Sequence, residues 1–194
     1  MNLYDFDDTI YDGDTNKDII KFFIKKFPFK VMRSLMKAKK LNKLYLKSEI
    51  EFERVKEVML GFLFEIDNIE MYIKRFVNKN IKKIKPWYLK NKSDNDIIVS
   101  ASYEIWLRPF CDKLKIKYLI ATKTNSEGKI VGKNCKGVEK VNKIKYHLPN
   151  AKFVNSYSDS SSDIPMLELS ENAYVVEGNN LVKYYSGYNF KNNK

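Results

Sequence analysis

The chain opens with MNLYDFDDT, residues 1–9, in which a short apolar segment runs directly into three acids. The apolar residues predict a brief buried strand that ends at the acids. Side chains alternate along an extended chain, so those of Asp5 and Asp7 are expected to point to the same side. Two carboxylates on one side raise one pKa unless a cation lies between them, and Mg2+ is the simplest such cation. Acids at this place are also typical of a loop that caps a helix.

Two sequence patterns follow that strand. Residues 14–92 carry apolar side chains at the three- and four-residue spacing of helices, and Pro28 ends the first of these helices. Residues 95–177 alternate between short apolar runs and helical segments. This alternation predicts an α/β fold with a mainly parallel sheet, and the helical block predicts an all-helical insertion after the first strand. The tail from Lys183, rich in Tyr, Asn and Lys, is expected on the surface.

Parallel sheets bind ligands at the carboxyl ends of their strands, which singles out the polar residues that follow each apolar run. Asp159 follows the apolar run at 151–157, where an acid beside the first acidic pair is best explained as a metal ligand. Ser162 or Asp163 could cap the helix that begins next. Ser100 ends the apolar run at 96–100 and could either cap a helix or, with backbone N–H groups, hold a phosphate oxygen.

A lysine at this edge would neutralise a phosphoryl group and the carboxylates around it. Lys136 lies directly before a predicted helix, and Lys140 within that helix is the alternative. With His147 as the only histidine, a zinc site or a Ser-His triad is not expected. The seven glycines form no phosphate-binding loop, which argues against an ATP- or NAD-binding protein.

The 194 residues include 36 basic and 24 acidic side chains, a net charge of +12. Only four of the basic residues are arginine, the side chain best suited to phosphate and base recognition. We therefore interpret the charge mainly as a lysine-coated surface, with attraction of small anions as a milder effect. The acidic N-terminus does not resemble a secretory signal, and two cysteines are too few for a disulfide framework. We expect a cytoplasmic monomer or homodimer.

The candidate residues form four short motifs in order along the chain. DFDDT at 5–9 is similar to a DxDx[TV] nucleophile motif, and VSAS at 99–102 to a second motif with Ser after a strand. Lys136 takes the place of a third-motif lysine, and Asp159 with Asp163 forms an acidic fourth motif. On these residues the chain resembles the haloacid dehalogenase-like superfamily of phosphohydrolases, in its phosphoserine-phosphatase-like branch. The helical insertion lies where this branch has its cap.

The resemblance implies a Rossmann-like core made of residues 1–14 and 93–194, with a helical cap at 15–92. It also implies Mg2+-dependent hydrolysis of a small phosphorylated metabolite through an aspartyl-phosphate. Asp5 would attack phosphorus, and Asp7 would act as general acid and then general base. A small phosphorylated substrate is the partner we expect, with no nucleic acid and no membrane.

The other roles that the resemblance implies belong to the phosphate site and the metal site. Phosphate contacts would come from Thr9, Ser100, Ala101 and Lys136. Metal ligands would be Asp5, Asp7 through its backbone carbonyl, and Asp159. Ser162 and Asp163 would lie around the metal, where Asp163 would orient a metal-bound water and the lysine.

Some residues depart from the family pattern. Asp8 stands where the first motif usually has Gly, Ser158 where the fourth motif usually has Gly, and Ser162 where Asn is frequent. No required carboxylate is missing. A phosphomutase or phosphotransferase carries the same motifs and differs in how fast water reaches the aspartyl-phosphate. A basic module that binds RNA or anionic lipid is the alternative outside enzymes.

Overall fold

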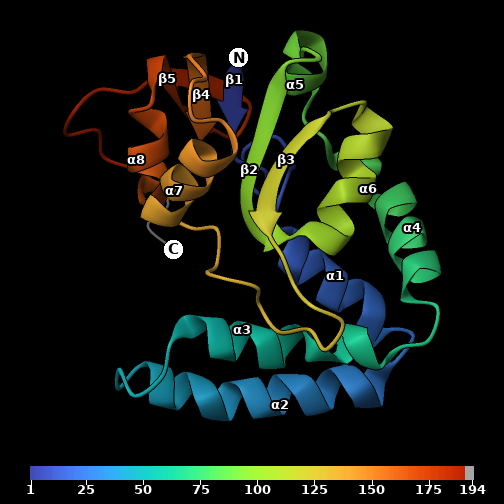
Figure 1. The fold of residues 1–194 in the computed structure, drawn as a ribbon. Helices are drawn as coiled ribbons and strands as arrows, with labels where there is room; N and C mark the ends of the chain where they lie inside the picture. The colour runs from blue at the N-terminus through green and yellow to red at the C-terminus, as the bar shows by residue number, and fades with distance from the viewer. Residues whose placement is uncertain (191–194) are drawn as a thin grey trace.

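Six strands form one sheet in the order β3-β2-β1-β4-β5-β6 in the computed structural model, which describes residues 1–190 (Figure 1). The strands are β1 (Asn2–Tyr4), β2 (Asp96–Tyr103), β3 (Tyr118–Thr122), β4 (Phe153–Ser158), β5 (Ser170–Glu177) and β6 (Asn180–Lys183). The first five run parallel, and β6 pairs antiparallel with β5. This confirms the predicted α/β fold with a mainly parallel sheet.

Helices fill the chain between β1 and β2 and then alternate with the strands. The insertion holds α1 (Thr15–Ile24), α2 (Pro28–Tyr45), α3 (Phe52–Leu60), η1 (Gly61–Glu65), α4 (Ile69–Asn80), η2 (Ile81–Lys83) and α5 (Pro86–Asn91). The later helices are α6 (Glu104–Leu114), α7 (Val138–His147), η3 (Ser161–Asp163) and α8 (Ile164–Leu167). The all-helical insertion after the first strand is therefore confirmed, as is the helix break at Pro28. The division into a core and a cap domain stays a prediction.

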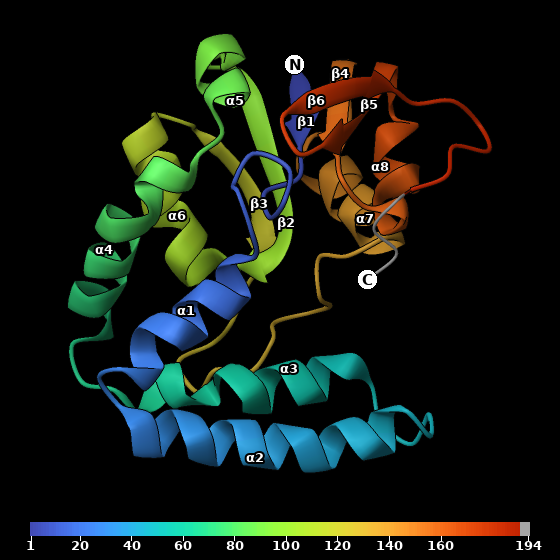
Figure 2. The ribbon, with the colours of Figure 1, turned by 180° about the vertical axis from the view of Figure 1, so that it is seen from behind.

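The short central strand β1 sends its side chains to both faces of the sheet, as alternation requires. Leu3 packs with Ile144 of α7 and Met166 of α8, whereas Tyr4 joins the larger cluster on the face that α6 covers. Figure 1 and Figure 2 show α6 on one side of the sheet, and α7 with α8 on the other. Both faces are covered, which explains why β1 and β2 are almost continuously buried.

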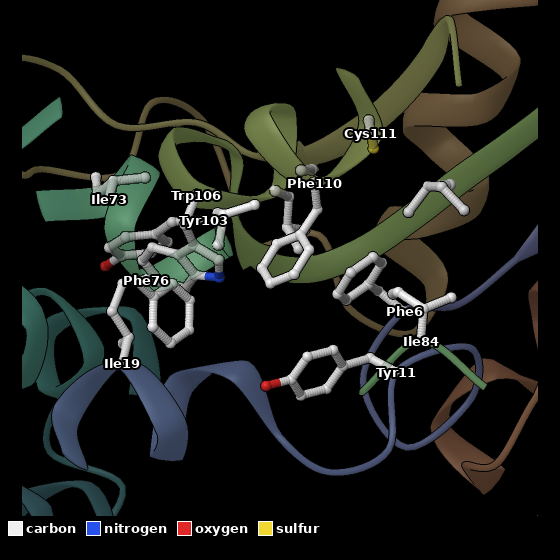
Figure 3. Packing of buried hydrophobic residues seen from close by; sticks show 14 of the residues in the cluster. Phe6, Tyr11, Ile19, Ile73, Phe76, Ile84, Tyr103, Trp106, Phe110 and Cys111 are labelled. Atoms are coloured by element: carbon white, nitrogen blue, oxygen red, sulfur yellow. The ribbon is translucent and has the colours of Figure 1, made fainter. Parts of the chain in front are cut away.

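An aromatic cluster joins the helical insertion to the sheet (Figure 3). The Phe110 ring of α6 lies 5.4 Å from that of Phe6, 5.7 Å from Tyr11 and 6.0 Å from Phe76 of α4, measured between ring centroids. Trp106 lies one turn earlier on α6 and donates its indole N–H to the Thr15 hydroxyl at 3.1 Å. This cluster therefore sets the position of the acidic loop after β1, because Phe6 and Tyr11 belong to it.

The tail from Lys183, where β6 ends, follows the surface prediction as far as residue 189, since its side chains are exposed or half-buried. It differs at Phe190, whose side chain is buried with Leu167 and Val175 beside α8. The many polar residues of the tail concealed this apolar anchor. Residues 191–194, which the prediction also covered, lie outside the described residues.

Replacing Phe110 by Ala should lower the free energy of unfolding by about 3–5 kcal/mol, because the change empties the centre of the aromatic cluster. Urea denaturation of the purified protein measures this. Phe29→Ala is the matched control, because its side chain is 90% exposed, and it should change the same quantity by less than about 1 kcal/mol. Equal losses in the two variants would contradict the assignment of Phe110 to the core.

Candidate active site

The carboxyl ends of β1, β2 and β4 meet at one edge of the sheet because β1 pairs in parallel with both neighbours. Tyr4 is opposite Tyr157 in this register, and the Asp5 N–H continues the pairing by donating to the Tyr157 carbonyl at 3.0 Å. Asp159 follows β4 two residues after Tyr157. The structure therefore brings the first and fourth predicted motifs together.

Lys140 lies at the centre of these acids. Its ammonium nitrogen is 2.6 Å from Asp5 Oδ1 and 2.6 Å from Asp163 Oδ2, and its side chain is 1% exposed. Ser158 donates to the same Asp163 oxygen at 2.7 Å. Although burial disfavours a charged amine, the two carboxylates raise the pKa of Lys140, so the lysine stays protonated.

The structure places Lys140, the alternative, and not Lys136 against the buried acids. Lys136 precedes α7 and its side chain is exposed, although it lines the same cavity. Lys140 is the third residue of α7, and a side chain there points back toward the sheet edge. Four residues thus separate an exposed lysine that lines the cavity from a buried lysine that contacts the acids.

The Thr9 hydroxyl links the two motif acids. It lies 3.4 Å from Asp5 Oδ2 and 3.1 Å from Asp159 Oδ1, and it accepts the Asp159 N–H at 3.1 Å. Thr9 is fully buried, so it holds the loop after β1 against the loop after β4. The Thr9 hydroxyl is thus occupied by the two motif acids in this structure, whereas the resemblance implied a contact with phosphate.

Asp7 is held separately from Asp5, by groups of the insertion and of β2. The Thr15 N–H donates to Asp7 Oδ1 at 2.6 Å, and the Ser102 hydroxyl donates to Asp7 Oδ2 at 2.5 Å. Asn16 in turn donates to the Ser102 oxygen at 2.8 Å. These contacts fix the direction of the Asp7 carboxyl toward the cavity that it lines.

Asp8, where the family pattern usually has Gly, adopts a backbone conformation that favours glycine. Its φ of 55° lies in the left-handed region, which Asp tolerates better than most residues. The Asp8 N–H donates to the Gly13 carbonyl at 2.8 Å, and the buried Lys85 ammonium donates to the Asp8 carbonyl. These bonds close the loop around Asp7 and hold Asp8 in its left-handed conformation.

Burial raises the pKa of Asp7 to about 6 and that of Asp159 to about 6. Burial also raises the pKa of Asp5, while Lys140 acts in the opposite direction and Asp163 and Asp159 add to the rise. Lys140 pairs with Asp5 and Asp163, which leaves the carboxylates of Asp7 and Asp159 without a paired lysine among the described residues. A further cation would stabilise the charged state of this site.

A cavity of about 340 Å³ lies above these acids, between the sheet edge and α3. The α3 residues that line it are Phe52, Lys56 and Met59. Lys56 is buried, and its ammonium donates to the Ala101 carbonyl at 2.5 Å and to Asn134 Oδ1 at 2.8 Å. Burial lowers the pKa of Lys56 to about 8.

The sequence reasoning missed several residues of this site. Ser102 carried a signal, because it lies two residues after Ser100 on the same side of an extended segment. Lys56, Asn134 and Thr15 carried none, since each is one polar residue among many. Their places depend on contacts between segments far apart in the sequence.

The proposed helix-capping roles are not seen. Ser100 Oγ accepts the Ser102 N–H at 3.1 Å, and the Ser100 side chain is buried beside the cavity. Asp163 begins α8 without a side-chain capping bond. Ser160, not Ser162, caps η3, and the Ser160 and Ser162 hydroxyls lie 2.9 Å apart.

Within residues 1–190, no group of three or more His, Cys, Asp or Glu side chains is arranged as a metal site. The Asp5 and Asp159 carboxylates, both in contact with Thr9, are nevertheless oxygen donors of the kind that Mg2+ prefers. Asp163 Oδ1 is buried without a hydrogen-bond partner among the described residues. An orphaned oxygen and an excess of carboxylates both fit a hydrated cation beside them.

Replacing Asp7 by Asn should stabilise the protein at pH 7.5 in the presence of a chelator, by about 1–3 kcal/mol. Folding raises the pKa of Asp7 to about 6, so the folded state favours the protonated carboxyl. The stability that this protonated carboxyl contributes is fully present below about pH 4 and is lost as the pH rises through 6. Asn imitates the protonated form at every pH, so the variant does not lose this stability. The difference between variant and parent should therefore vanish near pH 4, as followed by urea denaturation.

Asp12→Asn, at an exposed position of the same loop, is the control and should change stability by less than about 0.5 kcal/mol at either pH. A pH-independent effect of Asp7→Asn would show that the side chain is not held in a carboxylate-rich, buried site.

Residues 3–168 match the family described as haloacid dehalogenase-like hydrolase. No curated protein sequence matches the chain. A protein of unknown function from Bordetella pertussis Tohama I has a similar solved structure, with a TM-score of 0.73 and 20% identity over 89% of this chain and 87% of that chain. A phosphoserine phosphohydrolase-like protein from Francisella tularensis follows, with a TM-score of 0.54 and 20% identity over 89% and 84%.

A hydrolase of the same family from Salmonella enterica serovar Typhi has a TM-score of 0.59 and 14% identity over 87% of this chain and 59% of that chain. At these identities the structures show a shared fold. The family match spans most of the chain and includes all four motifs. The chain therefore belongs to the haloacid dehalogenase-like hydrolase family.

Proposed function

We propose that the chain is a phosphatase that hydrolyses a small phosphomonoester through an aspartyl-phosphate on Asp5. The observation that carries this proposal is the buried contact of Asp5 with the Lys140 ammonium at 2.6 Å, on the floor of the cavity. A carboxylate held beside a buried cation is suited to attack a centre that bears negative oxygens, because the cation reduces their mutual repulsion.

In the first step, an Asp5 oxygen forms a bond to phosphorus while the bond to the leaving oxygen breaks. Asp7 donates its proton to that leaving oxygen. A pKa of about 6 suits this role, since the carboxyl holds a proton close to neutral pH and can give it up. The hydrogen bonds from Ser102 and the Thr15 N–H keep the Asp7 carboxyl in place while its charge changes.

In the second step, Asp7 accepts a proton from water, and that water attacks the phosphorus of the aspartyl-phosphate. The bond from phosphorus to Asp5 breaks, which releases inorganic phosphate and restores the carboxylate. Lys140 stays protonated through both steps because Asp163 remains beside it. Its charge stabilises negative charge near the reacting phosphorus.

Ser100 and Ala101 are proposed to hold the phosphoryl oxygens. Both line the cavity, and both lie at the end of β2 beside Asp5. The Ser100 hydroxyl accepts the Ser102 N–H, so its own proton is free to point toward a phosphate. Lys136, exposed at the same cavity, is proposed to meet the substrate as it enters.

Mg2+ fits this site by the chemistry of its donors. Asp5, Asp159 and the backbone carbonyl of Asp7 would hold it, and Asp163 with Ser162 would contact its water shell. When bound, the ion would withdraw negative charge from the phosphoryl oxygens. Its presence would also offset the excess of carboxylates at the sheet edge.

We also propose the division into a core of residues 1–14 and 93–194 and a cap of residues 15–92. The cavity supports it, because its acids come from the core while Phe52, Lys56 and Met59 come from the insertion. The side of the substrate away from phosphorus would contact these insertion residues. The cap would therefore select the substrate.

Replacing Asp5 by Asn should lower the rate of Mg2+-dependent hydrolysis of p-nitrophenyl phosphate by at least about a thousandfold, because the amide is a poor nucleophile. Absorbance of the released nitrophenolate measures the rate, and circular dichroism checks the fold. Asp12→Asn, on the same loop but exposed, should keep the parent rate. Near-parental activity of Asp5→Asn would refute the nucleophile assignment.

Lys140 and Lys136 can be separated by the same substitution at each position. Lys140→Met should reduce kcat by at least about a hundredfold, since no other buried cation contacts Asp5 among the described residues. Lys136→Met should change kcat by less than about threefold and act mainly on KM. The reverse order of effects would restore Lys136 as the active-site lysine.

A further inference from the structure

The outward face of α2 combines exposed apolar side chains with a high positive charge. Residues 28–47 include seven basic side chains and no acid. Phe29 is 90% exposed, Met36 61% and Leu46 74%, and Met32 is also exposed. Large apolar side chains gathered on one exposed face usually mark an interaction site.

The exposed apolar and basic residues share one side of the helix. Positions 29, 32, 36, 40 and 43 of α2 follow each other at spacings of three or four, which places them on one face. The opposite face is the buried one and consists of Val31, Ser34 and Ala38. The inner face of the helix packs on the protein. The outer face is exposed and carries both apolar side chains and lysines.

α2 lies at one end of the molecule, and both ribbon views show α3 between it and the rest of the structure (Figure 1, Figure 2). Its outer face is therefore not covered by another described element. Glu65 contacts two basic groups at the start of the helix, since its carboxylate pairs with Arg33 and its carbonyl accepts from Lys30. The remaining five lysines, exposed along the rest of the segment, are Lys37, Lys39, Lys40, Lys43 and Lys47.

We propose that the outward face of α2 docks on the surface of an anionic lipid bilayer. Charge complementarity selects an anionic partner, because this face carries lysines and no acid. The exposed Phe29, Met32 and Met36 side chains select a partner with an accessible hydrocarbon interior, which RNA lacks. No helix within residues 1–190 is long and apolar enough to cross a membrane, so α2 would lie flat in the headgroup region.

This docking mode leaves the catalytic cavity on the other side of α3. The residues that α3 contributes to the cavity, Phe52, Lys56 and Met59, are separate from the outer residues of α2. The proposal is thus independent of the phosphatase assignment. It revises the expectation that the chain has no membrane partner.

Co-sedimentation with lipid vesicles tests the proposal. The full chain should bind vesicles of phosphatidylcholine that contain about one third phosphatidylglycerol, and bind vesicles of phosphatidylcholine alone at least about tenfold more weakly. Raising the salt concentration to about 500 mM should weaken the first interaction, since it screens the lysines. Absence of binding to the anionic vesicles at about 150 mM salt would overturn the proposal.

A pair of matched double variants locates the binding face. Phe29→Ser with Lys37→Glu should weaken binding to the anionic vesicles by at least about tenfold, because one apolar contact and one attractive charge are lost. Tyr146→Ser with Lys145→Glu on α7 makes the same change of charge at an exposed site, where Tyr146 is 83% exposed, and should change binding by less than about twofold. Equal losses would mean that net charge alone drives binding, which would overturn the role of α2.

A fluorescent reporter separates a bilayer from other anionic partners. Phe29→Trp should show a blue shift of its emission on anionic vesicles and quenching by brominated lipid chains. An unshifted emission, with binding that depends on Lys37 but not on Phe29, would instead assign the face to a purely electrostatic partner such as RNA or an acidic protein. Hydrolysis of a soluble phosphomonoester, unchanged in these variants, serves as the check that they fold.

Discussion

The buried contact of the Lys140 ammonium with the Asp5 and Asp163 carboxylates is the interaction on which the site depends. Three charges buried together cost a large desolvation free energy, which is offset only when each finds well-placed partners. Here the two oxygens that face the lysine both lie at 2.6 Å, and Ser158 donates to one of them. The contact joins α7 to the ends of β1 and β4, so it organises both the chemistry and the packing of the sheet edge.

The distribution of charge reconciles a strongly basic chain with an acidic centre. Most of the 36 basic residues lie on the surface, whereas the cavity contains six aspartates, from Asp5 to Asp163, and four lysines. Burial makes charges at the sheet edge interact strongly, while surface lysines are screened by water and salt. A strongly basic chain can therefore enclose an acidic cavity. The lysines of α2 extend that basic surface to one end of the molecule.

Particular residues show how far sequence reasoning reaches. Asp5, Asp7, Asp159 and Asp163 were predicted as a group because each follows a predicted strand, and the structure brings them to one sheet edge. Lys136 was chosen over Lys140 because it lies between two predicted elements, and position along the chain does not distinguish a residue just before a helix from one in its first turn. Lys56 reaches Ala101 and Asn134 from a helix far away in sequence. No local pattern distinguishes it from the other lysines, which is why it was not predicted.

The sequence by itself determined the α/β class, the helical insertion and the acidic motifs, because hydrophobic periodicity and strand-end position are local properties of the chain. Only the tertiary structure decided which lysine is buried among the carboxylates, how Ser102 and Thr15 hold Asp7, and where β6 and Phe190 pack. Those outcomes depend on distances between segments brought together by folding. Burial then sets the pKa values of the acids, and burial is a property of the folded molecule rather than of any stretch of sequence.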